Sequence, residues 1–311
     1  MSQPTIGVDV SKDALDACRL PERRARRFAN NQSGRAALLR WIGRDVACVV
    51  FEATGHYSKP LERALADSGL PAAKVNPKRA RRFAEAVGKL AKTDRIDAET
   101  LAAMARQLDL EPSVPVGQII EMLKEFVLAR RALVKDRTAA LNRAKRLVLP
   151  VLVTQNQERL AHIERDIEAI DAEIEALLEA DPQLRRRAEI LESIPGLGHA
   201  SAVAILAEMP ELGALEPKAA AALAGLAPQT RQSGTWKGRA RIKGGRAEAR
   251  RALYMPALVA ARFNPDLKRV YDRLVDAGKP PKLVITALMR KLVVLANALL
   301  RQDRCWTPTI A

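Results

Sequence analysis

The hydrophobic pattern of this chain changes completely at the segment Pro112 to Gly117, and this change constrains the fold more than any other feature. Before it, short β-branched and apolar runs alternate with helical patterns, which is typical of an α/β domain. After it, apolar residues recur every three or four positions, as in helices that pack on helices. Because 311 residues suffice for two cores, we expect an α/β domain followed by all-α parts.

Residues 1–111 are predicted to form the α/β domain. Two of its apolar runs, Thr5 to Val10 and Val46 to Glu52, read as strands that carry an acid near their end, Asp9 and Glu52. The remaining elements follow from periodicity and from turn residues. Further strands are predicted at 15–19, 25–30 and 72–76, and helices at 34–43, 59–68 and 94–107.

Residues 118–181 are predicted to form an antiparallel helical arm with a turn at Pro150. From Leu160 to Leu177 the apolar residues follow heptad spacing, which favours a coiled coil. The first helix of the arm is rich in Lys and Arg and the second in Asp and Glu, so an antiparallel pair brings opposite charges together. The arm would serve spacing or dimerisation; an ordinary helical hairpin within a larger core is the open alternative.

Residues 182–311 are predicted to be a helical, basic domain that closes with an apolar helix at 281–300. The element Ser193 to Gly198, followed by a helix, resembles a helix-hairpin-helix. In such a hairpin the backbone N–H groups of Gly196 and Gly198 can approach a phosphate. A simple glycine-rich helix connection is the alternative.

The charge of the chain points to a polyanionic partner. It has 52 Lys+Arg against 36 Asp+Glu, a net charge of +16, and nucleic acid is the class of partner that fits. No signal peptide and no apolar stretch of 18 residues is apparent, so we expect a cytoplasmic, nucleoid-associated protein without a membrane partner. The three cysteines and three histidines show no zinc-binding spacing, so any metal would have oxygen ligands.

Four acids form the main candidate site: Asp9, Glu52, Asp94 and Asp97. Asp94 and Asp97 are three residues apart at a helix start, so they share a face, and the helix N-terminus tolerates their charge. Four converging carboxylates would repel one another without a cation, and oxygen ligation suits Mg²⁺ or Mn²⁺. Each acid taken singly has a structural alternative, but together they favour a two-metal phosphoryl-transfer site.

A second candidate site is Ser233, in a basic glycine-rich loop from Gln229 to Gly245. From its position alone, the simpler role for this serine is a hydrogen bond to phosphate. The alternative is a nucleophile that needs a metal or a base to activate it. The loop also carries the basic residues most suited to phosphate contact, which are Lys237, Arg239, Arg241, Lys243 and Arg246.

These motifs together resemble the DEDD transposases of the IS110 family of insertion sequences over nearly the whole chain. The segments that carry the resemblance are Gly7 to Lys12, Glu52 to Gly55, Lys92 to Ala98, Ser193 to Gly198, Ala224 to Pro228, Ser233-Gly234 and Arg250 to Met255.

The resemblance implies a ribonuclease-H/RuvC-like fold for residues 1–111, with Asp9, Glu52, Asp94 and Asp97 as Mg²⁺ ligands. It also implies that Ser233 forms a transient phosphoserine bond with DNA. Partners implied by the family are target and donor double-stranded DNA, a structured guide non-coding RNA and further copies of the chain in a dimer or tetramer. The serine and the acids would then act in one site from different protomers, or from the same one.

Two other functions remain open on the sequence. One is a junction-resolving endonuclease that uses water activated at the four acids. The other is a nucleic-acid-binding protein without catalysis.

Overall fold

The computed structural model describes residues 3–53, 55–89, 91, 93–110, 112–113, 117–230, 232–238 and 240–308. The chain forms two compact units, Met1–Pro115 and Val116–Ala311. The first is mixed α/β, and the second is dominated by helices. The further division of the second unit at residue 181 remains a prediction.

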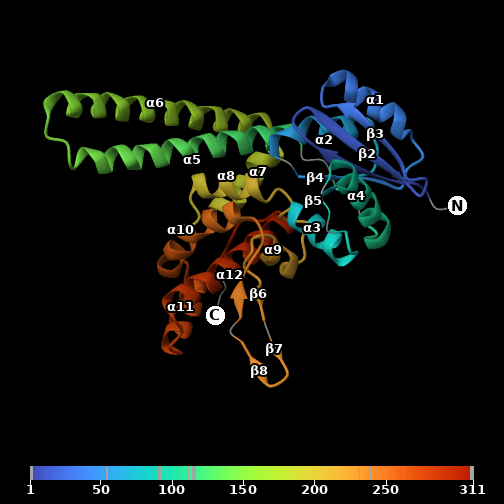
Figure 1. Cartoon of the computed structure of the whole chain (residues 1–311). Helices are drawn as coiled ribbons and strands as arrows, with labels where there is room; N and C mark the ends of the chain where they lie inside the picture. The colour runs from blue at the N-terminus through green and yellow to red at the C-terminus, as the bar shows by residue number, and fades with distance from the viewer. Residues whose placement is uncertain are drawn as a thin grey trace. The chain divides into compact units, whose positions relative to one another are not determined.

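Unit 1 is built on a five-stranded sheet in the order β3-β2-β1-β4-β5 (Figure 1). The strands β1 (Thr5–Val10), β2 (Ala14–Leu20) and β3 (Arg24–Ala29) are antiparallel neighbours. By contrast, β4 (Cys48–Glu52) and β5 (Ala72–Val75) continue the sheet in parallel from β1. This mixed α/β architecture is compatible with the RuvC-like domain that was expected.

Helices cover both faces of this sheet. One face packs against α1 (Gln32–Ile42) and α2 (Lys59–Asp67). A short 3-10 helix, Gly55–Tyr57, precedes α2 in the chain. The other packs against α3 (Pro77–Ala86) and α4 (Asp94–Leu108). The sequence analysis did not predict α3, although its first residue, Pro77, is of the type that suits the first position of a helix.

Gly7 allows α4 to lie close to β1. A Cβ atom at Gly7 would be 2.0 Å from the carbonyl oxygen of Ala98 and 2.4 Å from the amide nitrogen of Ala102. On the same face of β1, the Thr5 hydroxyl donates a hydrogen bond of 3.1 Å to the Ala102 carbonyl oxygen. Two successive turns of α4 therefore contact two alternate residues of β1, and the next turn brings the start of α4 toward Asp9.

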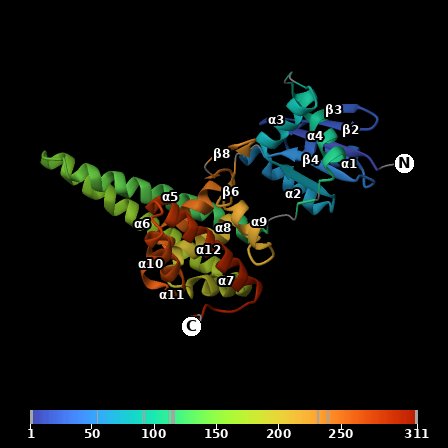
Figure 2. The same ribbon diagram turned by 90° about the horizontal axis from the view of Figure 1, so that it is seen from below.

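Unit 2 contains a long helix pair, α5 (Gln118–Ala144) and α6 (Pro150–Ala180), which lie side by side in both ribbon views (Figures 1 and 2). Ile163, Ile167 and Ile174 of the predicted seam are buried. Opposite charges meet as expected, since Arg130 donates to both carboxylate oxygens of Asp171. The finer coiled-coil assignment remains a prediction.

The remaining helices of unit 2 enclose one core, which the base of the arm joins through Leu123, Val127, Ile174 and Leu178. In chain order these helices are α7 (Pro182–Glu192), α8 (His199–Glu208), α9 (Pro217–Leu223), α10 (Ala247–Phe263), α11 (Pro265–Asp276) and α12 (Pro281–Arg301).

The last helix corrects one expectation. α12 is long and apolar enough to cross a membrane by length and composition, although the sequence analysis found no such stretch. Half of that apolar window is buried, and Leu288, Leu292 and Val293 belong to the core of unit 2. This burial is that of a core helix.

Candidate functional site

Asp9 and Glu52 lie side by side on one face of the sheet in unit 1. The parallel register pairs Val8 with Phe51, so Asp9 and Glu52 follow as the next neighbours on β1 and β4. Side chains alternate between the two faces of a strand. Because Val8 and Phe51 face α1 and α2, Asp9 and Glu52 face α4.

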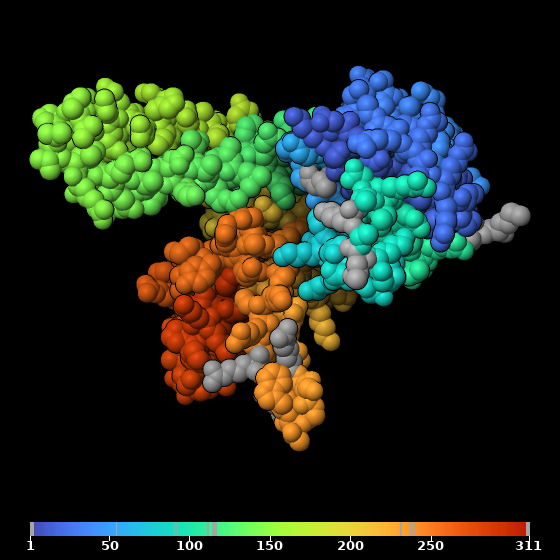
Figure 3. Space-filling view, in the orientation of Figure 1, coloured from blue at the N-terminus to red at the C-terminus, as the bar shows by residue number. Residues whose placement is uncertain are grey.

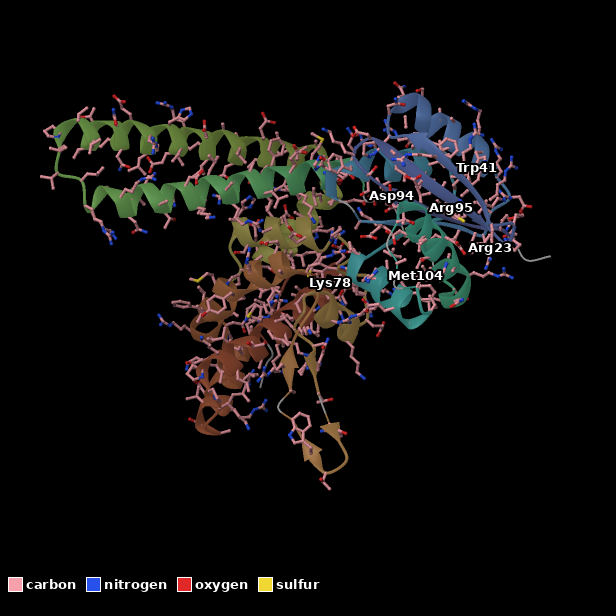
Figure 4. All side chains as sticks on the ribbon, in the orientation of Figure 1. Arg23, Trp41, Lys78, Asp94, Arg95 and Met104 are labelled. Atoms are coloured by element: carbon pink, nitrogen blue, oxygen red, sulfur yellow. The ribbon has the colours of Figure 1, made fainter. Side chains whose placement is uncertain are left out.

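The other two predicted acids come from the first turn of α4. Thr93 caps this helix, and its side-chain oxygen accepts a hydrogen bond of 3.3 Å from the amide of Ile96. The cap fixes the point at which the helix begins, and the helix N-terminus favours the acids that follow. Asp94 is exposed and Asp97 is half-buried. Figure 4 labels Asp94 and Arg95 at this end of α4.

The pKa of Asp9 reflects the charges of the other three predicted acids. Burial and, in decreasing order, the charges of Asp97, Asp94 and Glu52 together raise the pKa of Asp9 from its ordinary value to about 6. A carboxyl group in this setting is protonated more readily than an ordinary aspartate, and a nearby cation would favour its charged form. The arrangement is therefore one that a cation would stabilise.

Sequence reasoning missed a fifth acid in this region. Asp16 on β2 is the direct antiparallel partner of Asp9, and Arg27 on β3 is the direct partner of Asp16. A row of side chains thus crosses four neighbouring strands in the order Glu52, Asp9, Asp16, Arg27. The short turn between the first two predicted strands was the available signal, because its length sets which residues pair.

The donor chemistry of the four acids fits Mg²⁺ or Mn²⁺, which prefer oxygen ligands. Glu52 and Asp97 line a cavity of about 260 Å³ together with residues of α3. As the side chains stand, no three His, Cys, Asp or Glu among the described residues form a group that could hold a metal. The Asp94 carboxylate lies 3.9 Å from the guanidinium of Arg27.

The second candidate site, Ser233, lies on a two-tier β-hairpin where the sequence analysis expected a loop. The lower tier pairs β6 (Pro228–Gln229) with β9 (Arg241–Ile242), and the upper tier pairs β7 (Gln232–Ser233) with β8 (Trp236–Lys237). Ser233 is exposed and pairs directly with Trp236, whose surface is 59% exposed. The hairpin projects beyond the helices of its unit (Figure 3).

The predicted phosphate contacts of this hairpin fall into three groups. Arg241 and Lys243 are exposed. Arg246 is instead engaged at the base of the hairpin, where it donates to Glu211 over 2.5 and 2.7 Å and to the Glu208 carbonyl. Arg239 and the side chain of Lys237 lie outside the described residues.

Two glycines fix the base of this hairpin. A Cβ at Gly245 would be 2.2 Å from the amide nitrogen of Gly225, and both residues have positive φ. The two chain segments therefore cross at backbone contact, which explains why glycine is needed in Ala224 to Pro228.

The predicted helix-hairpin-helix glycines occupy different surroundings. A Cβ at Gly196 would be 2.7 Å from the backbone nitrogen of Ala260, so this glycine permits contact with α10. Gly198 precedes α8, and its Cβ position opens to free space. The next residue, His199, contacts the carboxylates of Glu175 and Glu192 at 2.7 Å each. Phosphate binding at this turn remains a prediction.

Comparison with known proteins identifies the family. A model of DEDD transposases of the IS110 type matches residues 6–153, and a model described as "Transposase IS116/IS110/IS902 family" matches residues 188–272. A "Pilin gene-inverting protein" of Moraxella bovis is 30% identical over 98% of both chains. The chain belongs to the IS110 family of transposases.

Two further relatives agree with this assignment. The transposase for insertion sequence element IS1111A of Coxiella burnetii is 26% identical, over 74% of this chain and 70% of its own length. An uncharacterized protein of insertion element IS110 from Streptomyces coelicolor is 32% identical, over 49% of this chain and 37% of its own. Membership in the IS110 family makes the chain an enzyme that acts on DNA, a recombinase of the transposase class.

Proposed function

We propose that this transposase cuts and rejoins DNA at a divalent-metal centre formed by Asp9, Glu52, Asp94 and Asp97, with Ser233 as its nucleophile. The observation that carries the proposal is that the four acids come from elements that meet on one face of the sheet. Two come from neighbouring strand ends on one sheet face and two from the helix end that lies over that face. Mg²⁺ is the expected ion, and Mn²⁺ is a chemical substitute.

In the proposed reaction the Ser233 oxygen attacks the scissile phosphorus. The new Oγ–P bond forms as the bond from phosphorus to the leaving strand breaks, and the hydroxyl proton passes to a base. Bound divalent ions supply charge stabilisation for such a displacement. The carboxylates hold the ions, and the basic hairpin holds the DNA backbone near the serine. Attack by a second DNA end on the phosphoserine reverses the step and rejoins DNA.

Covalent trapping tests the serine. We expect Ser233→Ala to form no protein-DNA adduct on denaturing gels with labelled DNA, while its thermal stability stays unchanged because Ser233 is exposed. Asp9→Asn should lose adducts and cleavage together. Cleavage that survives Ser233→Ala but not Asp9→Asn would favour the water-using endonuclease. Tight binding without cleavage in the unsubstituted protein, with Mg²⁺ and branched DNA, would favour a non-catalytic binding protein.

We also propose a structured guide RNA, transcribed from the same element, as a second nucleic-acid partner. The net charge of +16 suits nucleic-acid partners, and a guide RNA would give it a second polyanion beside DNA. RNA co-purified with the protein should map to the DNA flanking its gene, and a transcript of that DNA should bind more tightly than a shuffled transcript of equal length. Equal affinity for the two transcripts would contradict a specific guide.

A homo-oligomer, dimer or tetramer, completes the proposal. Apolar side chains are exposed at the far end of the arm, where Val148, Leu149 and Val151 have 87, 61 and 60% of their surface open. A second copy of the chain is a partner that could cover such residues. With DNA as its substrate, the enzyme would act in the cytoplasm, in association with the nucleoid.

Mixing two inactive variants tests both the oligomer and the composite site. If the acids and the serine come from different protomers, Asp9→Asn and Ser233→Ala should restore part of the activity when they are combined. If each protomer holds a complete site, the mixture stays inactive. Mass photometry of the unmixed protein then separates a monomer from an oligomer with independent sites.

A further inference from the structure

Arg27 and Asp16 extend the row of acids to the edge of the sheet. Asp16 lies between Asp9 on one side and Arg27 on the other, each as its direct cross-strand partner. Its side chain is only 16% exposed, whereas that of Arg27 is 64% exposed on the edge strand β3. The row therefore runs from a half-buried acid to a solvent-facing cation.

Arg27 also connects the sheet with α4. Its Nε atom lies 3.8 Å from Asp16 Oδ2, and a terminal nitrogen lies 3.9 Å from Asp94 Oδ2. One guanidinium thus stands between an acid that belongs to the sheet and an acid of the predicted metal centre. Asp94 is itself 56% exposed, so its side chain has room to turn away from Arg27.

The charges around this row indicate what Arg27 does there. Burial raises the pKa of Asp16, the charge of Arg27 lowers it, and Asp94 raises it again. Asp16 in turn is one of the charges that raise the pKa of Asp9. A cation beside Asp16 and Asp94 therefore offsets part of the repulsion within the acidic cluster.

We propose that Arg27 is a positioning residue of the metal centre: Asp16 holds it beside the cluster, and it draws Asp94 aside until a divalent ion binds. This inference rests on the proposed function, because it presumes that the acids bind metal. The divalent ion and Arg27 then compete for Asp94. The metal-free protein is stabilised by Arg27, and the metal-bound protein is not.

This competition predicts that substitutions of Arg27 and of Asp16 change the affinity for Mn²⁺ in opposite directions. Arg27→Gln removes a positive charge near the ion, so Mn²⁺ should bind about three- to tenfold more tightly. Asp16→Asn removes a negative charge and frees Arg27 for Asp94, so Mn²⁺ should bind more weakly by about the same factor. Arg27→Lys keeps the charge and should resemble the unsubstituted chain. The double variant should fall between the two single variants.

Electron paramagnetic resonance of free Mn²⁺, titrated against the full-length chain, measures these affinities without any reaction. Arg24→Gln is the matched control. It removes the same charge from the same strand, but residue 24 shares the face of Phe28, opposite to that of Arg27. Its affinity should stay within about twofold of the unsubstituted value. Equal or weaker binding in Arg27→Gln would overturn the inference.

Thermal unfolding with and without Mn²⁺ gives a second readout. Arg27→Gln should melt earlier than the unsubstituted chain in the absence of metal, and the difference should close when Mn²⁺ is saturating. If the difference in melting temperature stays the same when Mn²⁺ is added, Arg27 stabilises only the sheet edge and the inference is wrong. Asp9→Asn separates this failure from that of the proposed function. If Asp9→Asn binds Mn²⁺ normally, the metal centre itself is wrong.

Discussion

The acids of unit 1 and the serine of unit 2 are held in opposite ways. Asp9 and Glu52 end two neighbouring central strands, and α4 is fixed above them by backbone contact at Gly7. Ser233 lies near the end of a hairpin whose upper tier has only two residues in each strand. A rigid framework holds catalytic groups precisely, whereas an extended hairpin can follow a substrate. Under the proposed function, unit 1 would hold the divalent ions in place and the hairpin of unit 2 would carry Ser233 to the DNA.

Substitution of Gly7 should have the largest effect on stability, because it disrupts the packing of α4 on β1 in unit 1. The added Cβ in Gly7→Ala would overlap backbone atoms of α4 at 2.0 and 2.4 Å, so the helix has to move. We expect a loss of more than about 3 kcal/mol in the free energy of unfolding, together with loss of Mn²⁺ binding. Chemical denaturation and metal titration measure the two effects.

Gly198→Ala is the control for this substitution. Gly198 has a φ of −86° and open space at its Cβ position, so alanine should cost less than about 1 kcal/mol. If Gly7→Ala is equally mild, then close contact between β1 and α4 does not position the acids.

The dependence of stability on pH tests how strongly unit 1 buries and crowds Asp9. Its pKa in the folded chain is about 6, above its ordinary value of 3.8. The folded state therefore keeps a proton that the unfolded state has lost, and the metal-free protein should lose stability as pH rises from about 4 to 6. After allowance for solvent screening, we expect a contribution on the order of 1 to 2 kcal/mol.

Asp9→Asn should remove that part of the pH dependence, as measured by denaturation at a series of pH values without metal. Saturating Mg²⁺ should reverse the slope for the unsubstituted chain, because bound metal displaces the proton and favours the charged form. Identical slopes for both chains would contradict the burial and crowding of Asp9.

Arg246 tests whether the base of the hairpin in unit 2 is held more firmly than its exposed part. Burial acts to raise the pKa of Glu211, but the hydrogen bond from Arg246, a backbone hydrogen bond and the charges of Arg246 and Lys124 together lower that pKa below its ordinary value. Arg246→Ala should therefore cost about 1 kcal/mol of stability. The measurement is thermal unfolding, in which Glu211→Gln should show a smaller loss, since the neutral amide still accepts a hydrogen bond. An unchanged melting temperature for Arg246→Ala would show that the pair does not hold the hairpin.

The sequence predicted the strands and the helix that carry the four acids of unit 1, because periodicity and strand ends are local properties. The runs Thr5 to Val10 and Val46 to Glu52 contain β1 and β4, respectively, almost to the residue, and the helix that begins at Asp94 followed from helical spacing. Asp16 and Arg27 were missed because their place depends on the pairing of three strands. That pairing is a property of the whole sheet rather than of any one segment.

The basic hairpin shows that predictions from charge are also limited by contacts between distant segments. A count of Lys and Arg predicts a surface for phosphate, but it does not tell which side chain is already engaged. Arg246 was grouped with Arg241 and Lys243, yet the structure pairs it with Glu211, thirty-five positions earlier in the chain. The polar strands of the hairpin were also read as a loop, because two-residue strands carry no alternating pattern.

Arg241→Ala and Lys243→Ala should have the smallest effect on stability and a distinct effect on binding. Both side chains are exposed, so each substitution should change the free energy of unfolding by less than about 0.5 kcal/mol. If each contacts a phosphate, the dependence of log affinity for double-stranded DNA on log salt concentration should become shallower by about 0.9 per substitution. Fluorescence anisotropy over a salt series measures this slope, with Arg24→Gln of unit 1 as the control for lost charge. An unchanged slope in both variants would remove this part of the hairpin from the DNA interface, and with it the reason to expect the scissile phosphate near Ser233.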